Sequence, residues 1–223
     1  MISRNKSNFF RDLSITGWLI GINAIFFLVV ILSSLYYSSI ISFVALSPNT
    51  FFNNYYFWTL ITSMFMHGGF IHLFVNMLSL MFIGGFIEKI VGRKRFSWFY
   101  LGSGVFSGLL FVFVSLLFND SALLGTGFLT SAVGASGAIF GIAGLMVVLT
   151  PNLPVYAMFI PIPIKAKFAV PGLLVLIAVI SATGGFPVGN IAHLGGFLAG
   201  LGYGFFLKNK FRRKVAAISN FYR

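Results

Sequence analysis

The chain has 223 residues, of which 58% are hydrophobic and only 8% carry a charge. Soluble domains carry roughly 25% charged residues because a water-facing surface needs them, so this composition excludes a soluble protein and predicts an integral membrane protein. The net charge of +12 would by itself suit a nucleic-acid-binding protein, and the lack of cysteine excludes disulfides, a thiolate nucleophile and a thiolate metal site.

Six apolar runs have about the 20 residues that a helix needs to cross the hydrocarbon core of a bilayer. In chain order they cover residues 15–35, 71–90, 96–118, 131–150, 168–184 and 188–207. The fifth run is the shortest and is interrupted by Pro171 and Gly172. The predicted fold is therefore an all-α membrane protein, a bundle of six transmembrane helices in one domain (15–207).

The basic side chains occupy alternate connections between the predicted spans. All fifteen Lys and Arg residues lie in the N-terminal tail (1–14), the second connection, the fourth connection and the C-terminal tail (208–223). Positive charge marks the cytoplasmic side of a membrane protein, so both tails are predicted to be cytoplasmic. The basic segment KNKFRRK then sets the topology beside anionic headgroups, and the expected partner is the lipid bilayer and not a nucleic acid.

This orientation assigns a depth to the polar residues of three spans. The second, fourth and sixth spans begin on the outer side. His72 and Asn76, one helical turn apart, therefore lie in the outer half of the membrane together with Ser136 and His193. His67 comes just before the second span, so the three histidines of the chain lie at one level. Ionisable side chains inside a membrane are costly, which makes them candidates for function.

Glycines at helical spacing indicate that the fourth and sixth spans touch. The fourth span contains Gly137, Gly141 and Gly144, and the sixth contains Gly196, Gly200 and Gly204. Such stripes let two helix backbones approach closely, and this contact would bring the Ser136 hydroxyl within hydrogen-bonding reach of the His193 imidazole. A serine elsewhere in the spans, such as Ser107, is expected only to bond the carbonyl one turn back in its own helix.

A serine beside a histidine base is the arrangement that nucleophilic catalysis needs. Ser136 is the predicted nucleophile and His193 the base that takes its proton, while Phe140, one turn below Ser136, offers a surface on which the imidazole can stack. A dyad and not a triad is predicted. The acidic residues of the chain fall on the cytoplasmic side or in the third connection: Asp12, Glu88 and Asp120.

Acyl transfer also needs hydrogen-bond donors for the negative charge that develops on the substrate oxygen. The side chains of His72 and Asn76 and the backbone N–H of Ser136 are candidates for this oxyanion hole, and Gly134 would let the backbone turn just before the nucleophile. The residues for zinc hydrolysis are missing, because no Glu accompanies a His. A mechanism with two catalytic aspartates is excluded because the two aspartates of the chain lie on opposite sides of the membrane. No metal or cofactor is expected.

The segments GASGAIFG, AHLGGFLAG and HGGFIHLFVNM resemble the rhomboid intramembrane serine proteases. The likeness extends to FWTLITSMFMHGGFIHLFVNMLSLMFIGGFIEKIVGRKRF and to FIPIPIKAKFAV, and covers most of residues 57–204. It implies a minimal six-helix, prokaryotic-type core in the cytoplasmic membrane of a prokaryote, with a water-filled cavity and active site that open to the extracytoplasmic side. It also implies a serine endopeptidase that hydrolyses peptide bonds in or near the transmembrane segments of single-span membrane proteins.

The resemblance also implies roles for individual residues. Ser136 matches the nucleophile of the family and His193 its general base. His72 and Asn76 match the side chains of the oxyanion hole, and His67 matches the first histidine of the H-x4-H-x3-N pattern, whose role is more structural.

Glycines and aromatic residues around the dyad follow the same pattern with two departures. Gly134 and Gly196 match glycines that flank the dyad in the family. Many members have Trp-Arg where this chain has Trp58 and Thr59, so a residue that orders the first outer connection is replaced. Some members have Tyr in place of Phe140. Neither change removes a catalytic atom.

Two other functions were weighed against intramembrane proteolysis. A catalytically inactive rhomboid-like protein would bind membrane clients without cutting them, but such relatives generally lack the serine or the histidine, and both are present here. A transporter or channel would show internal repeats and polar residues through the full depth of the membrane, and the sequence shows neither.

Overall fold

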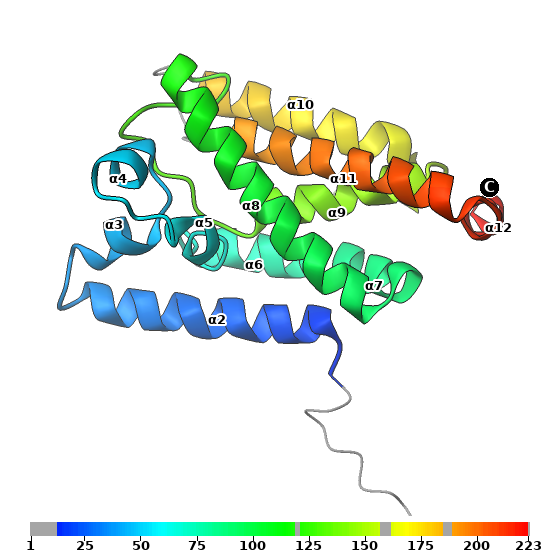
Figure 1. Cartoon of the computed structure of the whole chain (residues 1–223), viewed down its shortest axis with the longest axis horizontal. Helices are drawn as coiled ribbons and strands as arrows, with labels where there is room; N and C mark the ends of the chain where they lie inside the picture. Colours follow the sequence, from blue (N-terminus) through cyan, green and yellow to red (C-terminus); the bar gives the residue numbers. More distant parts are fainter. Residues whose placement is uncertain (1–12, 119–120, 157–161, 185–188, 223) are drawn as a thin grey trace, which may run out of the picture.

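The computed structural model describes residues 13–118, 121–156, 162–184 and 189–222. Within that part of the chain, five helical segments are long and apolar enough to cross a membrane: α2 (Ile15–Ser34), α6 to α7 (Phe70–Val91), α8 (Arg93–Leu117), α10 (Ala166–Gly184) and α11 (Asn190–Lys210). With the shorter helix α9 (Ser136–Leu149) between α8 and α10, consecutive helices of the bundle run in opposite directions (Figure 1). This arrangement confirms the predicted helical membrane bundle. The predicted start of the sixth span at residue 188 lies outside the described residues.

The sixth apolar helix, α9, is shorter than the run predicted for it. It covers Ser136–Leu149, 14 residues, whereas the prediction began at residue 131. The backbone of Gly134 has a φ of 113°, which no right-handed helix contains, so the helix cannot extend back past it. Twelve of the fourteen residues of α9 are buried. A helix that is apolar on all sides lies inside a bundle, and α9 is enclosed by its neighbours instead of by lipid.

Backbone contact between α9 and α11 confirms the prediction made from their glycines. A methyl group at Gly196 would overlap the carbonyl oxygen of Gly137, and one at Gly200 would overlap that of Gly141. Gly204, further along α11, lies against the side chain of a valine of α9. The two helices are therefore as close as backbone atoms allow, and any side chain at the first two positions would force them apart.

Ser107 of α8 does not bond within its own helix, so that prediction was wrong. Its hydroxyl donates to the carbonyl of Ala192 in α11, at 2.7 Å. This contact is possible because Gly195 faces α8, where a Cβ atom would lie 3.2 Å from the Cα atom of Ser107. The hydrogen bond ties α8 to α11 at the residue just before His193.

The second span contains one turn of a different helix type. Between α6 (Phe70–Ser79) and α7 (Gly85–Val91) the chain forms a π-helix, η1 (Leu80–Gly84), which accommodates one more residue per turn than an α-helix can. Gly84 faces the side chain of Leu80, and both are buried.

A buried carboxylate attaches α2 to the end of the second span. Glu88 of α7 accepts hydrogen bonds from the backbone N–H groups of Ile15 and Thr16, both at 2.8 Å, and from the Thr16 hydroxyl at 2.7 Å. Ser14 caps the same helix by accepting from the N–H of Gly17 at 3.0 Å. A negative charge at a helix N-terminus satisfies donors that the helix itself leaves free and is favoured by the helix dipole.

Replacing Glu88 with alanine is expected to lower the free energy of unfolding by about 3 kcal/mol, because two buried donors and one half-buried donor lose a charged acceptor. The measurement is the thermal unfolding midpoint of the purified protein in detergent. Glu88→Gln keeps an acceptor oxygen and should fall between the alanine variant and the wild type. Equal midpoints for Glu88→Ala and wild type would mean that apolar packing alone holds α2.

Three short helices lie in the connection between α2 and α6: α3 (Ile40–Val44), α4 (Pro48–Asn53) and α5 (Thr59–Thr62). The indole N–H of Trp58 donates to the carbonyl of Phe43, and the hydroxyl of Thr62 donates to that of Val44, both at 2.8 Å. These two bonds hold the connection with threonine, and not arginine, at position 59. At position 59, where many proteins with the resembled motif have arginine, the hydroxyl of Thr59 donates to the carbonyl of Tyr56 at 2.5 Å.

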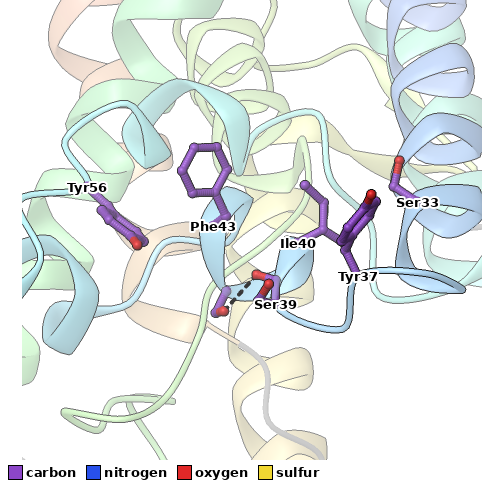
Figure 2. Close-up of a pocket in the computed structure, with 7 residues that line it drawn as sticks. Ser33, Tyr37, Ser39, Ile40, Phe43 and Tyr56 are labelled. Atoms are coloured by element: carbon purple, nitrogen blue, oxygen red, sulfur yellow. Dashed lines mark hydrogen bonds between the residues drawn. The ribbon is translucent and has the colours of Figure 1, made fainter.

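A hollow of about 350 Å³ separates the end of α2 from α3 (Figure 2). It is lined by one isoleucine and otherwise by hydroxyl and aromatic side chains: Ser33, Tyr37, Ser39, Ile40, Ser42, Phe43 and Tyr56. The rings of Tyr56 and Phe43 also contact Trp58, with centroids 4.5 and 4.9 Å from the indole. Aromatic rings with polar ends are typical of a membrane–water interface. None of the predicted site residues lines this hollow.

The remaining elements lie at the end of the bundle opposite to the connection between α2 and α6 (Figure 1). Two short antiparallel strands, β1 (Pro154–Val155) and β2 (Ile164–Lys165), lie in the chain between α9 and α10. Beyond α11 the chain forms a further helix, α12 (Arg212–Phe221), which the sequence analysis did not predict.

Candidate active site

Ser136 is the first residue of α9, and this position gives it free backbone donors. The first bond within the helix runs from the N–H of Ile139 to the carbonyl of Ala135, at 3.0 Å. The N–H groups of the first turn therefore have no acceptor within the helix. A helix N-terminus carries partial positive charge, and Ser136 lies at that terminus.

His193 lies in the first turn of α11, opposite Ser136. Its Nε2 atom is 2.8 Å from the Ser136 Oγ atom, and the imidazole is buried, with 8% of its surface exposed. The ring of Phe140 lies against the imidazole, with centroids 4.7 Å apart and planes inclined by 35°. The contact between α9 and α11 at Gly196 thus brings together the three side chains that the sequence analysis grouped as nucleophile, base and stacking surface.

The start of α11 is held by a residue that the sequence analysis did not single out. The Asn190 side-chain amide donates to the carbonyl of Leu123 at 2.9 Å, and the N–H of Ile191 donates to that of Leu124 at 3.0 Å. Asn190 lies three residues before His193, on the same face of the helix. The sequence could have indicated Asn190, because it is a polar residue three positions before His193 in an apolar span.

The acidic residues do not join the described site. Glu88, the one acidic residue in the described part of the chain, is engaged with α2 at the other end of the bundle. Asp12 and Asp120 lie outside the described residues. Among the described residues, no hydrogen-bond partner reaches the Nδ1 atom of His193.

His72 of α6 and Ser136 both lie next to Gly134. A Cβ atom at Gly134 would lie 2.9 Å from the Cε1 and Nε2 atoms of His72 and 3.8 Å from the Ser136 Oγ atom. The Nδ1 atom of His72 accepts weakly from the N–H of Gly68 at 3.4 Å. With Nδ1 as acceptor, a neutral imidazole carries its proton on Nε2. That Nε2–H lies beside the space that a side chain at Gly134 would fill.

His67 and Asn76 have supporting contacts. The His67 ring packs edge-on against that of His72, with centroids 5.2 Å apart, and its Nδ1 atom is 3.3 Å from the carbonyl oxygen of Phe65. The Asn76 amide donates to the carbonyl of His72, one turn back, at 2.8 Å. The structure therefore places His72 next to Gly134 and His67 against His72, while one N–H of the Asn76 amide bonds within α6.

These observations define a class: a multi-pass helical membrane protein with a half-buried serine bonded to a buried histidine at the N-termini of two glycine-packed helices. A family model for the Rhomboid domain matches residues 54–210, and the chain therefore belongs to the rhomboid family. The match includes every residue predicted for the site.

Individual relatives cover a similar region. RHOMBOID-like protein 1 of Arabidopsis thaliana is 40% identical over 153 residues, 66% of this chain and 34% of its own length. RHOMBOID-like protein 5 of the same plant is 39% identical over 153 residues, 67% of this chain and 44% of its own. Rhomboid-like protease 3 of Toxoplasma gondii is 29% identical over 150 residues, 67% of this chain and 51% of its own. The chain thus matches less than half of the length of the two plant relatives.

Proposed function

We propose that this protein is an intramembrane serine endopeptidase that cleaves single-span membrane proteins in or near their transmembrane segments. The observation that carries the proposal is the 2.8 Å approach of the Ser136 Oγ atom to the His193 Nε2 atom inside an apolar bundle. A serine hydroxyl next to an imidazole base is an activated nucleophile. A further support is that one similar protein is named a rhomboid-like protease.

In the proposed reaction, the Ser136 Oγ atom attacks the carbonyl carbon of the scissile peptide bond, and its proton passes to His193 Nε2. The negative charge on the tetrahedral intermediate is stabilised by the N–H of Ser136, the Nε2–H of His72 and the Asn76 amide, whose second N–H is not used in its bond to the His72 carbonyl. His193 then gives the proton to the leaving amine, which leaves an acyl-enzyme. Water, deprotonated by His193, attacks the ester and releases the second product and the free serine. No cofactor takes part.

The location proposed for this reaction follows from the charge distribution. Basic connections mark the cytoplasmic end of a bundle, and Ser136 lies at the other end, so the proposed side for the reaction is extracytoplasmic. The resemblance to prokaryotic-type members is the ground for proposing the cytoplasmic membrane of a prokaryote. Water for deacylation would then enter from that side, through a cavity that opens outward.

A fluorophosphonate probe tests the proposal because it reacts with activated serines. The purified wild-type protein in detergent is expected to be labelled, whereas Ser136→Ala and His193→Ala should not be. Absence of labelling on a folded wild-type protein would contradict the proposal and favour the alternative of an inactive rhomboid-like protein that binds membrane clients.

Asn76→Ala is expected to slow cleavage by about 10²-fold, less than the loss of the nucleophile, because an oxyanion donor is removed while others remain. The measurement is the cleavage rate of a reconstituted transmembrane substrate. Asn54→Ala, at an exposed position in the outer connection, is the matched control and should cleave at the wild-type rate. A wild-type rate for Asn76→Ala would mean that its amide only bonds within α6.

A further inference from the structure

Cationic side chains are concentrated at one end of the bundle, where the chain also forms α12. The basic residues of the described chain are all exposed, and they lie at the end of α7, the start of α8, in β2, the start of α10, the end of α11 and in α12: Lys89, Arg93, Lys94, Arg95, Lys165, Lys167, Lys208, Lys210, Arg212, Arg213 and Lys214. Glu88, the one described acidic residue, is buried and bonded to α2. No described carboxylate neutralises these cations.

One face of α12 packs on the bundle. Val215 is buried in the same apolar cluster as Leu149 at the end of α9 and Leu207 near the end of α11. Tyr222, seven residues after Val215, places its ring edge-on against Phe86 of α7, with centroids 5.6 Å apart. The helix is therefore docked across the ends of three helices.

The other face of α12 carries charge and an exposed aromatic ring. Arg212, Arg213 and Lys214 are exposed in its first turn, and Phe221 near its end has 81% of its surface exposed. A helix that combines a basic face with an uncovered aromatic ring is typical of segments that lie in a membrane interface.

The direction of α12 suits that position. The chain leaves α11 at Phe211, whose φ of −126° and ψ of 44° are not helical, and α12 turns away from the axis of α11 (Figure 1). The guanidinium of Arg95 stacks over the Phe211 ring at 5.0 Å, and the ammonium of Lys210 lies 5.4 Å from the ring of Phe206. Since α11 crosses the membrane, the helix that follows this turn lies at the level of the lipid headgroups.

We propose that α12, with Lys208 and Lys210, forms a binding surface for the headgroups of anionic phospholipids, and that these headgroups hold α12 against the bundle. Charge complementarity identifies the occupant, because exposed cations without described carboxylates face the headgroup layer. The proposal holds whether or not the protein is a protease.

Amide hydrogen exchange of residues 212–221 in lipid nanodiscs tests it. Nanodiscs of phosphatidylcholine alone are compared with nanodiscs that contain about 30% phosphatidylglycerol. The anionic lipid is expected to slow exchange in α12 by about threefold or more at low salt, and about 0.5 M salt should remove the difference. In the triple variant Arg212→Gln, Arg213→Gln, Lys214→Gln, the two lipids should give equal exchange.

A control variant carries the same change in net charge at the same end of the bundle but outside α12: Lys89→Gln, Lys165→Gln, Lys167→Gln. It should keep the response to anionic lipid. Unchanged protection of α9 and α11 shows that each variant is folded. Equal exchange of the wild-type α12 in the two lipids would overturn the proposal. The proposal would also be overturned if both triple variants lost the response to anionic lipid equally, because the response would then depend on the total positive charge of this end of the bundle and not on a site on α12.

Discussion

Replacing Ser136 with alanine is expected to reduce cleavage of a reconstituted transmembrane substrate by about 10⁴-fold or more while the protein remains folded. The Ser136 Oγ atom is the hydroxyl oxygen bonded to the His193 imidazole, so its removal leaves the base with no nucleophile. The structural loss is small, because one hydrogen bond contributes about 1 kcal/mol and alanine fits the first position of α9.

The measurement pairs the cleavage rate with the thermal unfolding midpoint of each variant. Ser97→Ala is a matched control: Ser97 lies at the other end of the bundle and bonds only the carbonyl of Arg93 in its own helix. It should cleave like the wild type. If Ser136→Ala kept more than about 1% of the wild-type rate, the loss would fall short of that of a catalytic nucleophile, and the proposed mechanism would be wrong.

Gly196→Ala is expected to impair stability and cleavage together. The new methyl group would overlap the carbonyl oxygen of Gly137, a backbone atom that cannot rotate away, so α9 and α11 must separate. Overpacking of this kind lowers the free energy of unfolding by about 3 kcal/mol. Separation also lengthens the distance between Ser136 Oγ and His193 Nε2, and a displacement of about 1 Å can slow a reaction by about 10²-fold.

Gly202 on the same helix provides the control. A methyl group there would meet open space, so Gly202→Ala should leave cleavage unchanged and should stabilise α11 slightly, since alanine favours helix over glycine. Unfolding midpoints and cleavage rates are compared for the two alanine variants. Equal values would show that the close approach at Gly196 does not position the dyad.

Composition and spacing were sufficient to predict the helical bundle and the contact between two of its helices. Hydropathy located the spans to within a few residues, because each span must be apolar over its whole length. Gly137 and Gly196 predicted the approach of α9 and α11 because only small residues permit it. The placement of Ser136 opposite His193 follows from that approach together with their similar depth.

The parts that could not be predicted depend on local backbone geometry or on partners distant in the chain. The start of α9 depends on the positive φ of Gly134. A hydropathy pattern does not show a backbone angle, so the apolar residues around Gly134 extended the predicted span past the true start of the helix. Ser107 bonds to a residue 85 positions away in the chain, and Glu88 bonds to one 72 positions away. The local sequence around each residue does not indicate such a distant partner. The helix α12 was missed because its basic residues indicated only a tail.

The π-helical turn η1 sets the rotational phase of the second span. In a regular α-helix, the twelve residues from Asn76 to Glu88 would place these side chains about 120° apart around the axis. One extra residue absorbed in Leu80–Gly84 reduces that angle to about 20°. A single continuous face can therefore present His72 and Asn76 to the site at one end and Glu88 to α2 at the other. Adding or deleting one residue within this turn would leave the hydropathy of the span unchanged and yet put its two ends out of phase.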